Sequence, residues 1–203
     1  MILQSPLVNP FGQIEQSTLC RVRGAQYNLS VTSEGKRVTG IEFNSRSVEE
    51  TESLGRAIGA LLQPGDVIAL SGPLGAGKTA LTRGIGAGWG AREPVTSPTF
   101  TLIHEHRRAG NKSVLYHVDC YRLAGEADAS TIGLEDMLHG EDIVVLEWPE
   151  NVEPALPPER LALALHDVGG TQRRIEARAT GARSLELLAA LREAWSASQA
   201  GRN

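Results

Sequence analysis

The stretch SGPLGAGKT, residues 71–79, restricts what this chain can fold into more than any other part of it. It matches the pattern G-x-x-x-x-G-K-[ST], whose glycines let successive backbone N–H groups turn inward around phosphate oxygens. The lysine supplies a positive charge near the β and γ phosphates, and the hydroxyl after it is a natural ligand for Mg²⁺. The pattern predicts a triphosphate site made by Gly72, Leu74, Gly75, Ala76, Gly77, Lys78, Thr79 and Ala80.

The segments on either side of this loop have the character that such a site requires. Residues 66–72, DVIALSG, form a short apolar run typical of a strand, and residues 78–90, KTALTRGIGAGWG, continue as a helix whose positive dipole end points at the same anion. The alternative is a glycine-rich turn with a chance Lys-Thr pair. The order of strand, loop and helix counts against it, so we expect a nucleotide to bind here.

Two further apolar runs end in acids. Residues 113–119, SVLYHVD, end at Asp119, and residues 142–147, DIVVLE, end at Glu147. Both runs are typical of buried strands, whose carboxyl ends point toward the ligand crevice in an open α/β sheet. Each acid alone is also compatible with a solvated edge or a helix cap. Together they suggest one magnesium contact and one group that orients water, and the spacing does not decide which acid does which.

The remaining segments complete an α/β pattern. Capping-box spacing of Ser47 and Glu50 predicts a helix that Pro64 and Gly65 end. Antiparallel strands are predicted at 161–168 and 173–179, and a helix at 184–195 that Ser184 caps and after which the end frays. Residues 1–43 are predicted to form an N-terminal extension, a loose tail followed by a β-hairpin of YNLSVTS and RVTGIEF; residues 44–203 form the nucleotide-binding domain.

Other candidate signals are weaker. The hydroxyl-rich segment VTSPTFTLIHEH, residues 95–106, fits either a loop that senses the γ-phosphate or a strand with threonines on its wet face. DVGG, residues 167–170, imitates a GTPase motif, but no N-K-x-D segment follows it, so we expect a hairpin turn. The five histidines lack metal-site spacing. Two groups of basic residues are ordinary solvated faces, or else the best candidates for contact with an acidic or RNA-bearing partner: Arg107, Arg108 and Lys112, and Arg173, Arg174, Arg178 and Arg183.

Composition narrows the class of protein. A chain of 203 residues with 41% hydrophobic and 22% charged residues can bury one main core. The formal charge of −4 gives no net attraction to nucleic acid or to an anionic membrane. Two cysteines, Cys20 and Cys120, form neither a disulfide framework nor a metal clip. No apolar stretch approaches the ~20 residues of a membrane span, so we expect a cytoplasmic protein.

Several segments, taken in order, resemble the bacterial TsaE (YjeE) family, small ATPases needed to form threonylcarbamoyladenosine in tRNA. The resemblance runs from about Ser47 to Glu150 and is carried by LSGPLGAGKTALTRGIGAGWG, VTSPTFTLIHEH, LYHVDCYRL, GLEDML and VVLEWPE. Residues 1 to about 40 lie outside it. The loop also carries Pro73 where the family commonly has an acidic residue, which affects the stiffness of the loop more than its N–H groups.

The resemblance implies an α/β fold, a P-loop NTPase-like sandwich with a central mixed parallel and antiparallel sheet flanked by helices. It implies ATP and Mg²⁺ as ligands, with Thr79 and Glu147 on the metal. Lys78, Asp119, Glu147 and Trp148 are the implied catalytic residues, although Trp148 is equally suited to packing. The implied partners are the TsaB and TsaD proteins, which form a complex that ATP hydrolysis resets. The chain would contact tRNA only through that complex.

The expected function is therefore an ATPase, weak alone, whose product is a conformational change in a protein complex. Its rival is a small-molecule or nucleoside kinase with the same loop, but the Pro-rich segment after Glu147 offers no helical lid over the phosphates. A nucleotide-dependent binding module without turnover is the third possibility.

Overall fold

The computed structural model describes residues 16–22, 25–31, 37–98, 101–110 and 112–200, with side chains from residue 40 onward. The strands are β1 Gln16–Val22, β2 Ala25–Val31, β3 Arg37–Ser45, β4 Val67–Ser71, β5 Ile103–Arg107, β6 Val114–Asp119, β7 Ile143–Glu147, β8 Leu161–Gly169 and β9 Gln172–Ala179. The helices are α1 Val48–Leu61, α2 Lys78–Trp89, α3 Glu126–Thr131, α4 Leu134–His139, the 3₁₀ segment η1 Pro149–Ala155 and α5 Ala182–Ala200.

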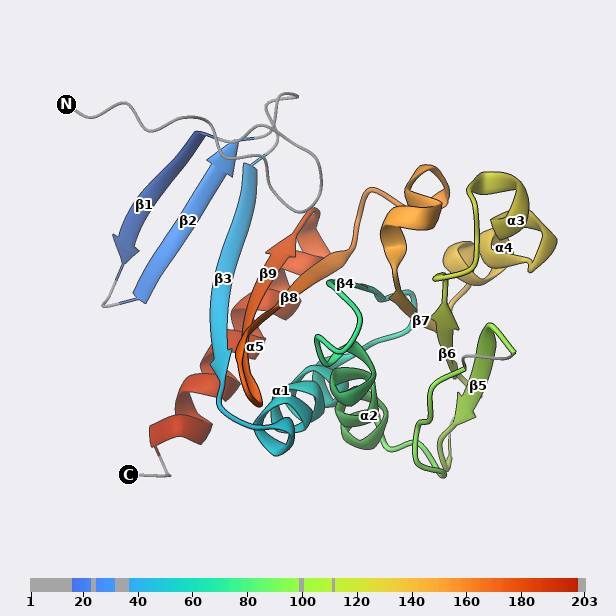
Figure 1. Ribbon diagram of the computed structural model, residues 1–203, viewed down its shortest axis with the longest axis horizontal. Coiled ribbons are helices and arrows are strands. Elements are labelled where there is room, and N and C mark those ends of the chain that lie inside the picture. Colours follow the sequence, from blue (N-terminus) through green and yellow to red (C-terminus); the bar gives the residue numbers. More distant parts are fainter. Residues whose placement is uncertain (1–15, 23–24, 32–36, 99–100, 111, 201–203) are drawn as a thin grey trace.

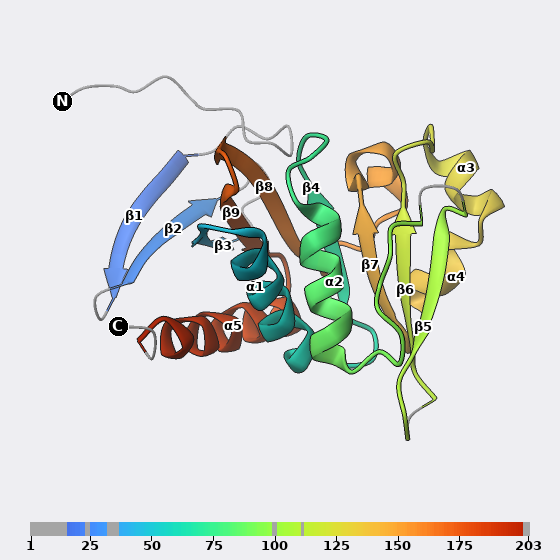
Figure 2. The same cartoon turned by 60° about the horizontal axis from the view of Figure 1, so that its bottom comes forward.

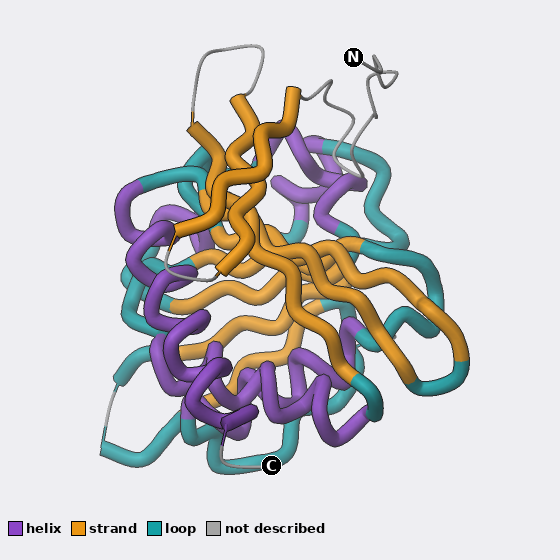
Figure 3. The backbone as a smooth tube through the Cα atoms, turned by 90° about the vertical axis from the view of Figure 1, so that its left-hand side faces the viewer, coloured by secondary structure: helices purple, strands orange, loops and turns teal. Residues whose placement is uncertain are grey.

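The strands of the described residues form one twisted sheet in the order β1-β2-β3-β9-β8-β4-β7-β6-β5 (Figures 1 and 3). Strands β8, β4, β7 and β6 are parallel neighbours, while β9 and β5 pair antiparallel at either side of them. Helices α1, α2 and α5 cover one face, and α3, α4 and η1 cover the other beside β6 and β7 (Figure 2). The predicted fold class, a P-loop NTPase-like sandwich with a mixed sheet, is confirmed.

The central strands are buried on both faces. In β7, Ile143 and Val145 pack under α1 and α2, whereas Val144 and Leu146 pack under α3 and α4. Such a strand is a continuous apolar run rather than an alternating one, as parallel sheets with helices on both faces require. This is why the run DIVVLE could be recognised in the sequence.

Helices α1 and α2 pack with their backbones in contact. A Cβ atom on Gly55 would lie 2.3 Å from the Leu81 carbonyl oxygen, and one on Gly84 would lie 2.1 Å from that of Glu52. Gly59 and Gly88 repeat the arrangement one turn further along each helix. This close packing fixes the position of α2, whose first turn follows the glycine loop.

The start of α1 has the predicted cap. Ser47 Oγ accepts a hydrogen bond from the Glu50 N–H at 3.2 Å, and the Glu50 carboxylate accepts one from the Arg46 N–H. One orphan donor of the helix is thereby satisfied, and the entering chain is held in an extended conformation.

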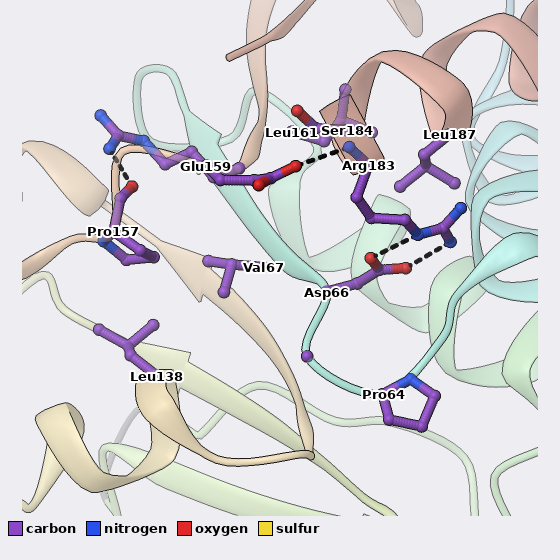
Figure 4. A pocket seen from close by; sticks show the side chains of 12 residues that line it. Pro64, Asp66, Val67, Leu138, Pro157, Glu159, Leu161, Arg183, Ser184 and Leu187 are labelled. Carbon is purple, nitrogen blue, oxygen red and sulfur yellow. Dashed lines mark hydrogen bonds and ion pairs between the residues drawn. The ribbon is translucent and has the colours of Figure 1, made fainter. Parts of the chain in front are cut away.

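The last helix differs from its prediction at both ends. It begins at Ala182, ahead of Ser184, and it continues to Ala200 where fraying was expected. Glu159, from another segment, accepts a hydrogen bond from the Arg183 N–H, and the Arg183 guanidinium makes two bonds to the buried Asp66 carboxylate at 2.8 and 3.0 Å (Figure 4). These partners are distant in the sequence, so local capping rules could not locate the start of the helix.

The N-terminal strands extend the sheet. β2 pairs antiparallel with β3, as the hairpin prediction required, although its turn at 32–36 lies outside the described residues. The loose tail was wrong for residues 16–22, because they form β1 and pair with β2. β3 in turn pairs with β9. The boundary suggested at residues 43–44 falls inside β3, and the division of the chain there stays a prediction.

We expect Gly84→Ala to lower the free energy of unfolding by about 2 to 3 kcal/mol, because the added methyl group forces two helix backbones apart. Alanine is intrinsically the better helix former, so the propensity effect has the opposite sign. The measurement is urea denaturation followed by circular dichroism. Arg83→Ala, on the exposed side of the same helix, is the control and should change stability by less than about 0.5 kcal/mol. Equal stability of the two variants would contradict the packing described above.

Candidate functional site

The glycine loop, residues 72–77, leaves the carboxyl end of β4 and enters α2. Gly72 has a φ of +136°, and a Cβ atom there would lie 2.4 Å from the Leu165 carbonyl oxygen, so only glycine fits. Gly77, also at positive φ, stands at the N-cap of α2, and Leu74 at the tip of the loop is 87% exposed. The loop therefore presents backbone rather than side chains at the start of a helix, as a phosphate site requires.

Lys78 lies against the loop from which it emerges. Its ammonium group donates to the carbonyl oxygens of Gly72, at 2.6 Å, and Pro73, at 3.0 Å, and lies 3.7 Å from the ring centroid of Trp148. Burial lowers the pKa of Lys78, and the carboxylates of Glu147, Glu150 and Asp119 act in the opposite direction. The lysine is thus a buried cation held by neutral acceptors and the face of an indole ring.

Trp148 follows β7 in a left-handed conformation, with φ 60° and ψ 50°, that is uncommon outside glycine. Its backbone N–H donates to the Leu70 carbonyl oxygen at 3.1 Å, and the centroid of its ring lies 5.0 Å from that of the Tyr121 ring. Such backbone strain concentrates at functional sites. Here it turns the indole over Lys78.

Glu147 is the polar centre of the site. Its carboxylate is buried and accepts from the Thr79 hydroxyl at 3.2 Å and, more weakly, from that of Thr82 at 3.5 Å. His117 Nε2 lies 2.9 Å from Oε1 of the same carboxylate, and its Nδ1 is buried without a hydrogen-bond partner among the described residues. Since β4, β6 and β7 pair in parallel, residues far apart in the sequence converge here.

Asp119 ends the strand beside Glu147 and lies opposite it in the register of β6 and β7. It is half-buried, and its carboxylate accepts from the Tyr121 N–H at 3.0 Å. Burial, with help from Asp119, raises the pKa of the neighbouring Cys120 thiol to about 12, so this thiol stays protonated. The two acids therefore share one edge, with Glu147 against the loop and Asp119 nearer solvent.

These residues fit a magnesium ion that accompanies a triphosphate. Mg²⁺ usually takes one or two carboxylates together with phosphate oxygens and water, and Thr79 and Glu147 provide a hydroxyl and a carboxylate in contact. Among the described residues, no group of three or more His, Cys, Asp or Glu side chains could hold a metal by itself. The donor set thus suits a cation that arrives with the nucleotide.

Thr82 and His117 were not among the predicted site residues. Thr82 lies three residues after Thr79 on the same side of α2, a spacing that could have indicated it. His117 lies two residues before Asp119 and therefore on the same face of β6. Its contact with Glu147 depends on the strand register, which the sequence does not reveal.

The structure also shows where the weaker sequence signals lie. In the hydroxyl-rich segment the strand begins only at Ile103, and the N–H groups of Thr101 and Leu102 both donate to the Pro98 carbonyl oxygen in a turn; Thr99 and Phe100 lie outside the described residues. The hairpin predicted at DVGG is present, but Asp167 to Gly169 still belong to β8, and the turn to β9 consists of Gly170 and Thr171. Arg183 belongs to an internal ion pair rather than to a solvated face.

Comparisons of the sequence and of the structure with known proteins lead to the same family. The family model of "Threonylcarbamoyl adenosine biosynthesis protein TsaE" matches residues 45–175. A tRNA threonylcarbamoyladenosine biosynthesis protein TsaE from Bacillus subtilis is 38% identical over 145 residues, which cover 70% of this chain and 88% of that protein. The protein of the same name from Streptomyces coelicolor is 45% identical over 112 residues, covering 55% and 76%. The crystal structure of B. subtilis YdiB superposes with a TM-score of 0.65 at 33% identity, covering 77% of this chain and 96% of that one. None of the helices in the described ranges is long and apolar enough to span a membrane.

We expect Glu147→Ala to lower the free energy of unfolding by about 2 kcal/mol, because it removes the partner of the fully buried His117 and the acceptor of the Thr79 hydroxyl, whereas Thr82 still donates to the Lys78 carbonyl oxygen. Asp119→Ala should cost less than about 1 kcal/mol, since that carboxylate is only half-buried and accepts a hydrogen bond from the Tyr121 N–H near the surface. Chemical denaturation without nucleotide measures both. A larger loss for Asp119→Ala would show that the polar centre is placed wrongly.

Proposed function

Since the chain belongs to the TsaE family, whose members serve threonylcarbamoyl adenosine biosynthesis, we propose that it binds ATP with Mg²⁺ at the glycine loop and hydrolyses it. The observation that carries this proposal is the buried Glu147 carboxylate in contact with the Thr79 hydroxyl, directly beside Lys78 and the loop. A P-loop threonine and a strand-end carboxylate are the groups that P-loop NTPases use for magnesium.

The site would promote hydrolysis mainly by stabilising negative charge on the phosphates and by positioning the reacting groups. The loop N–H groups and the start of α2 would bind phosphate oxygens, and Lys78 would exchange two carbonyl acceptors for the more strongly accepting phosphates. Bound Mg²⁺ would neutralise charge on the phosphates. Asp119, at the edge and nearer solvent, is suited to orient a water molecule, while His117 would hold Glu147 in place from behind.

Hydrolysis would drive a conformational change in a partner complex. We propose that the chain acts on a complex of TsaB and TsaD and resets it between rounds of threonylcarbamoyl transfer to the adenosine beside the anticodon of tRNA. The formal charge of −4 favours contact with tRNA through that complex rather than directly. Such a role would place the protein in the cytoplasm together with that complex and tRNA.

We expect Lys78→Ala to weaken ATP binding about tenfold or more, because the phosphates would lose the ammonium group that directly follows the loop. Lys112→Ala, which removes an exposed lysine from the β5–β6 connection, should leave the affinity unchanged.

Glu147→Gln should raise the magnesium concentration required for binding and turnover, whereas Asp119→Asn should slow turnover more than it weakens binding. Calorimetric titrations at several magnesium concentrations, with a phosphate-release assay, distinguish these effects. If Glu147→Gln changes neither quantity, the roles of the two acids are reversed.

Labelled ATP should yield little inorganic phosphate with the purified protein alone and considerably more when TsaB and TsaD are added. Transfer of label to a small hydroxyl acceptor would instead indicate a kinase. Tight binding without phosphate release under either condition would indicate a nucleotide-dependent binding module. Vigorous hydrolysis that the two partners leave unchanged would contradict the proposed role in the complex.

A further inference from the structure

One guanidinium group joins the glycine loop to the turn between β8 and β9. Arg173, the second residue of β9, donates from Nε to the Ala76 carbonyl oxygen at 2.9 Å and from Nη2 to that of Gly75 at 3.1 Å. The sequence had grouped this arginine with solvated or partner-facing ones. Its side chain is only 14% exposed, and it bonds to the loop from outside.

The third guanidinium nitrogen binds the turn. Arg173 Nη1 donates to the carbonyl oxygens of Gly170, at 3.0 Å, and Gln172, at 2.7 Å, and lies 3.3 Å from the Asp167 carboxylate. All three nitrogens are therefore used, most of them on backbone acceptors. Only arginine provides donors in such a rigid planar fork; a lysine ammonium would satisfy one side at a time.

These contacts determine which way two peptide groups of the loop point. The C=O and N–H of a trans peptide unit point in opposite directions. By holding the carbonyls of Gly75 and Ala76 outward, Arg173 turns the N–H groups of Ala76 and Gly77 to the inner side of the loop. Its charge is also close, since a Cβ atom on Gly77 would lie 3.9 Å from Arg173 Nε. An anion held by those N–H groups would gain from both effects.

We propose that Arg173 is a positioning residue for the phosphates of the nucleotide, holding the loop N–H groups in their binding orientation and adding a positive charge behind them. The proposal rests on the proposed nucleotide binding and extends it, because Arg173 contacts the loop and not the ligand. It also makes the β8–β9 turn part of the site, since the same side chain fixes both segments.

The test is calorimetric titration of the full chain with Mg-ATP. Arg173→Ala should weaken binding about 10- to 100-fold, the effect of losing two charge-assisted hydrogen bonds that orient donors. Arg173→Lys keeps the charge but not the fork, and should recover only part of that loss. Arg174→Ala is the matched control: it removes the next arginine of β9, whose half-exposed side chain reaches Glu42 and Glu176 only at 4.0 and 3.7 Å, and should bind as the wild type does.

Chemical rescue separates positioning from general destabilisation. Guanidinium ion at a concentration that does not denature the protein should restore part of the ATP affinity of Arg173→Ala, and sodium chloride at equal ionic strength should not. If Arg173→Ala and Arg173→Lys both bind Mg-ATP like Arg174→Ala, or if loss of affinity follows loss of thermal stability without rescue, the positioning role is overturned. If the wild type itself fails to bind Mg-ATP, the proposed function fails first and this role with it.

Discussion

The parallel pairing of β4 with β7 is the constraint on which the site depends. Its register places Leu70 beside Glu147, so the strand that leads into the glycine loop and the strand that ends in the buried acid finish at the same level. Side chains alternate along a strand, so a slip of one residue would turn Glu147 to the opposite face of the sheet, away from Thr79. Residues 143–146 are apolar and buried on both faces, so the residue that opposes the slip is Glu147, whose buried carboxylate would lose the Thr79 hydroxyl and His117. The buried acid therefore depends on the register and also helps to specify it.

Features set by neighbouring residues were predictable from the sequence. The glycine loop with its flanks, the Ser47 cap and the apolar strands ending at Asp119 and Glu147 each follow from a local pattern, and together with the TsaE resemblance they gave the fold class. Contacts between distant segments were not predictable. His117 reaches Glu147 through strand register, Glu159 starts α5 from another loop, and Arg173 meets the glycine loop across a hairpin turn. The first strand was missed because QSTLCRV has little hydrophobic alternation and gains its order by pairing with β2.

The site keeps its charged groups in contact with acceptors and donors of the protein itself. Lys78 rests on two loop carbonyls and an indole face, the Ala76 N–H donates to the Pro73 carbonyl oxygen, and Glu147 collects two hydroxyls and an imidazole. The bonds of Lys78, Thr79 and the Ala76 N–H could be exchanged for bonds to a phosphate or a metal ion while His117 keeps its contact with Glu147, which would lower the cost of switching between the two sets of partners. Exchange of this kind suits a protein that binds and releases nucleotide repeatedly.

The pairing of β3 with β9 has a consequence for how the chain comes to its fold. β3 is synthesised early and β9 late, so the three N-terminal strands, which pair with one another, have no connection to the rest of the sheet until nearly the whole polypeptide has emerged. Pairings between such distant segments form slowly, and unpaired strand edges are the surfaces at which chains associate wrongly. The nucleotide-binding elements β4 and α2 lie between them in the sequence and can assemble with α1 before the edge is closed. Until β3 and β9 pair, a nascent chain has an open strand edge on each side of this junction, where association with another chain would compete with completion of the sheet.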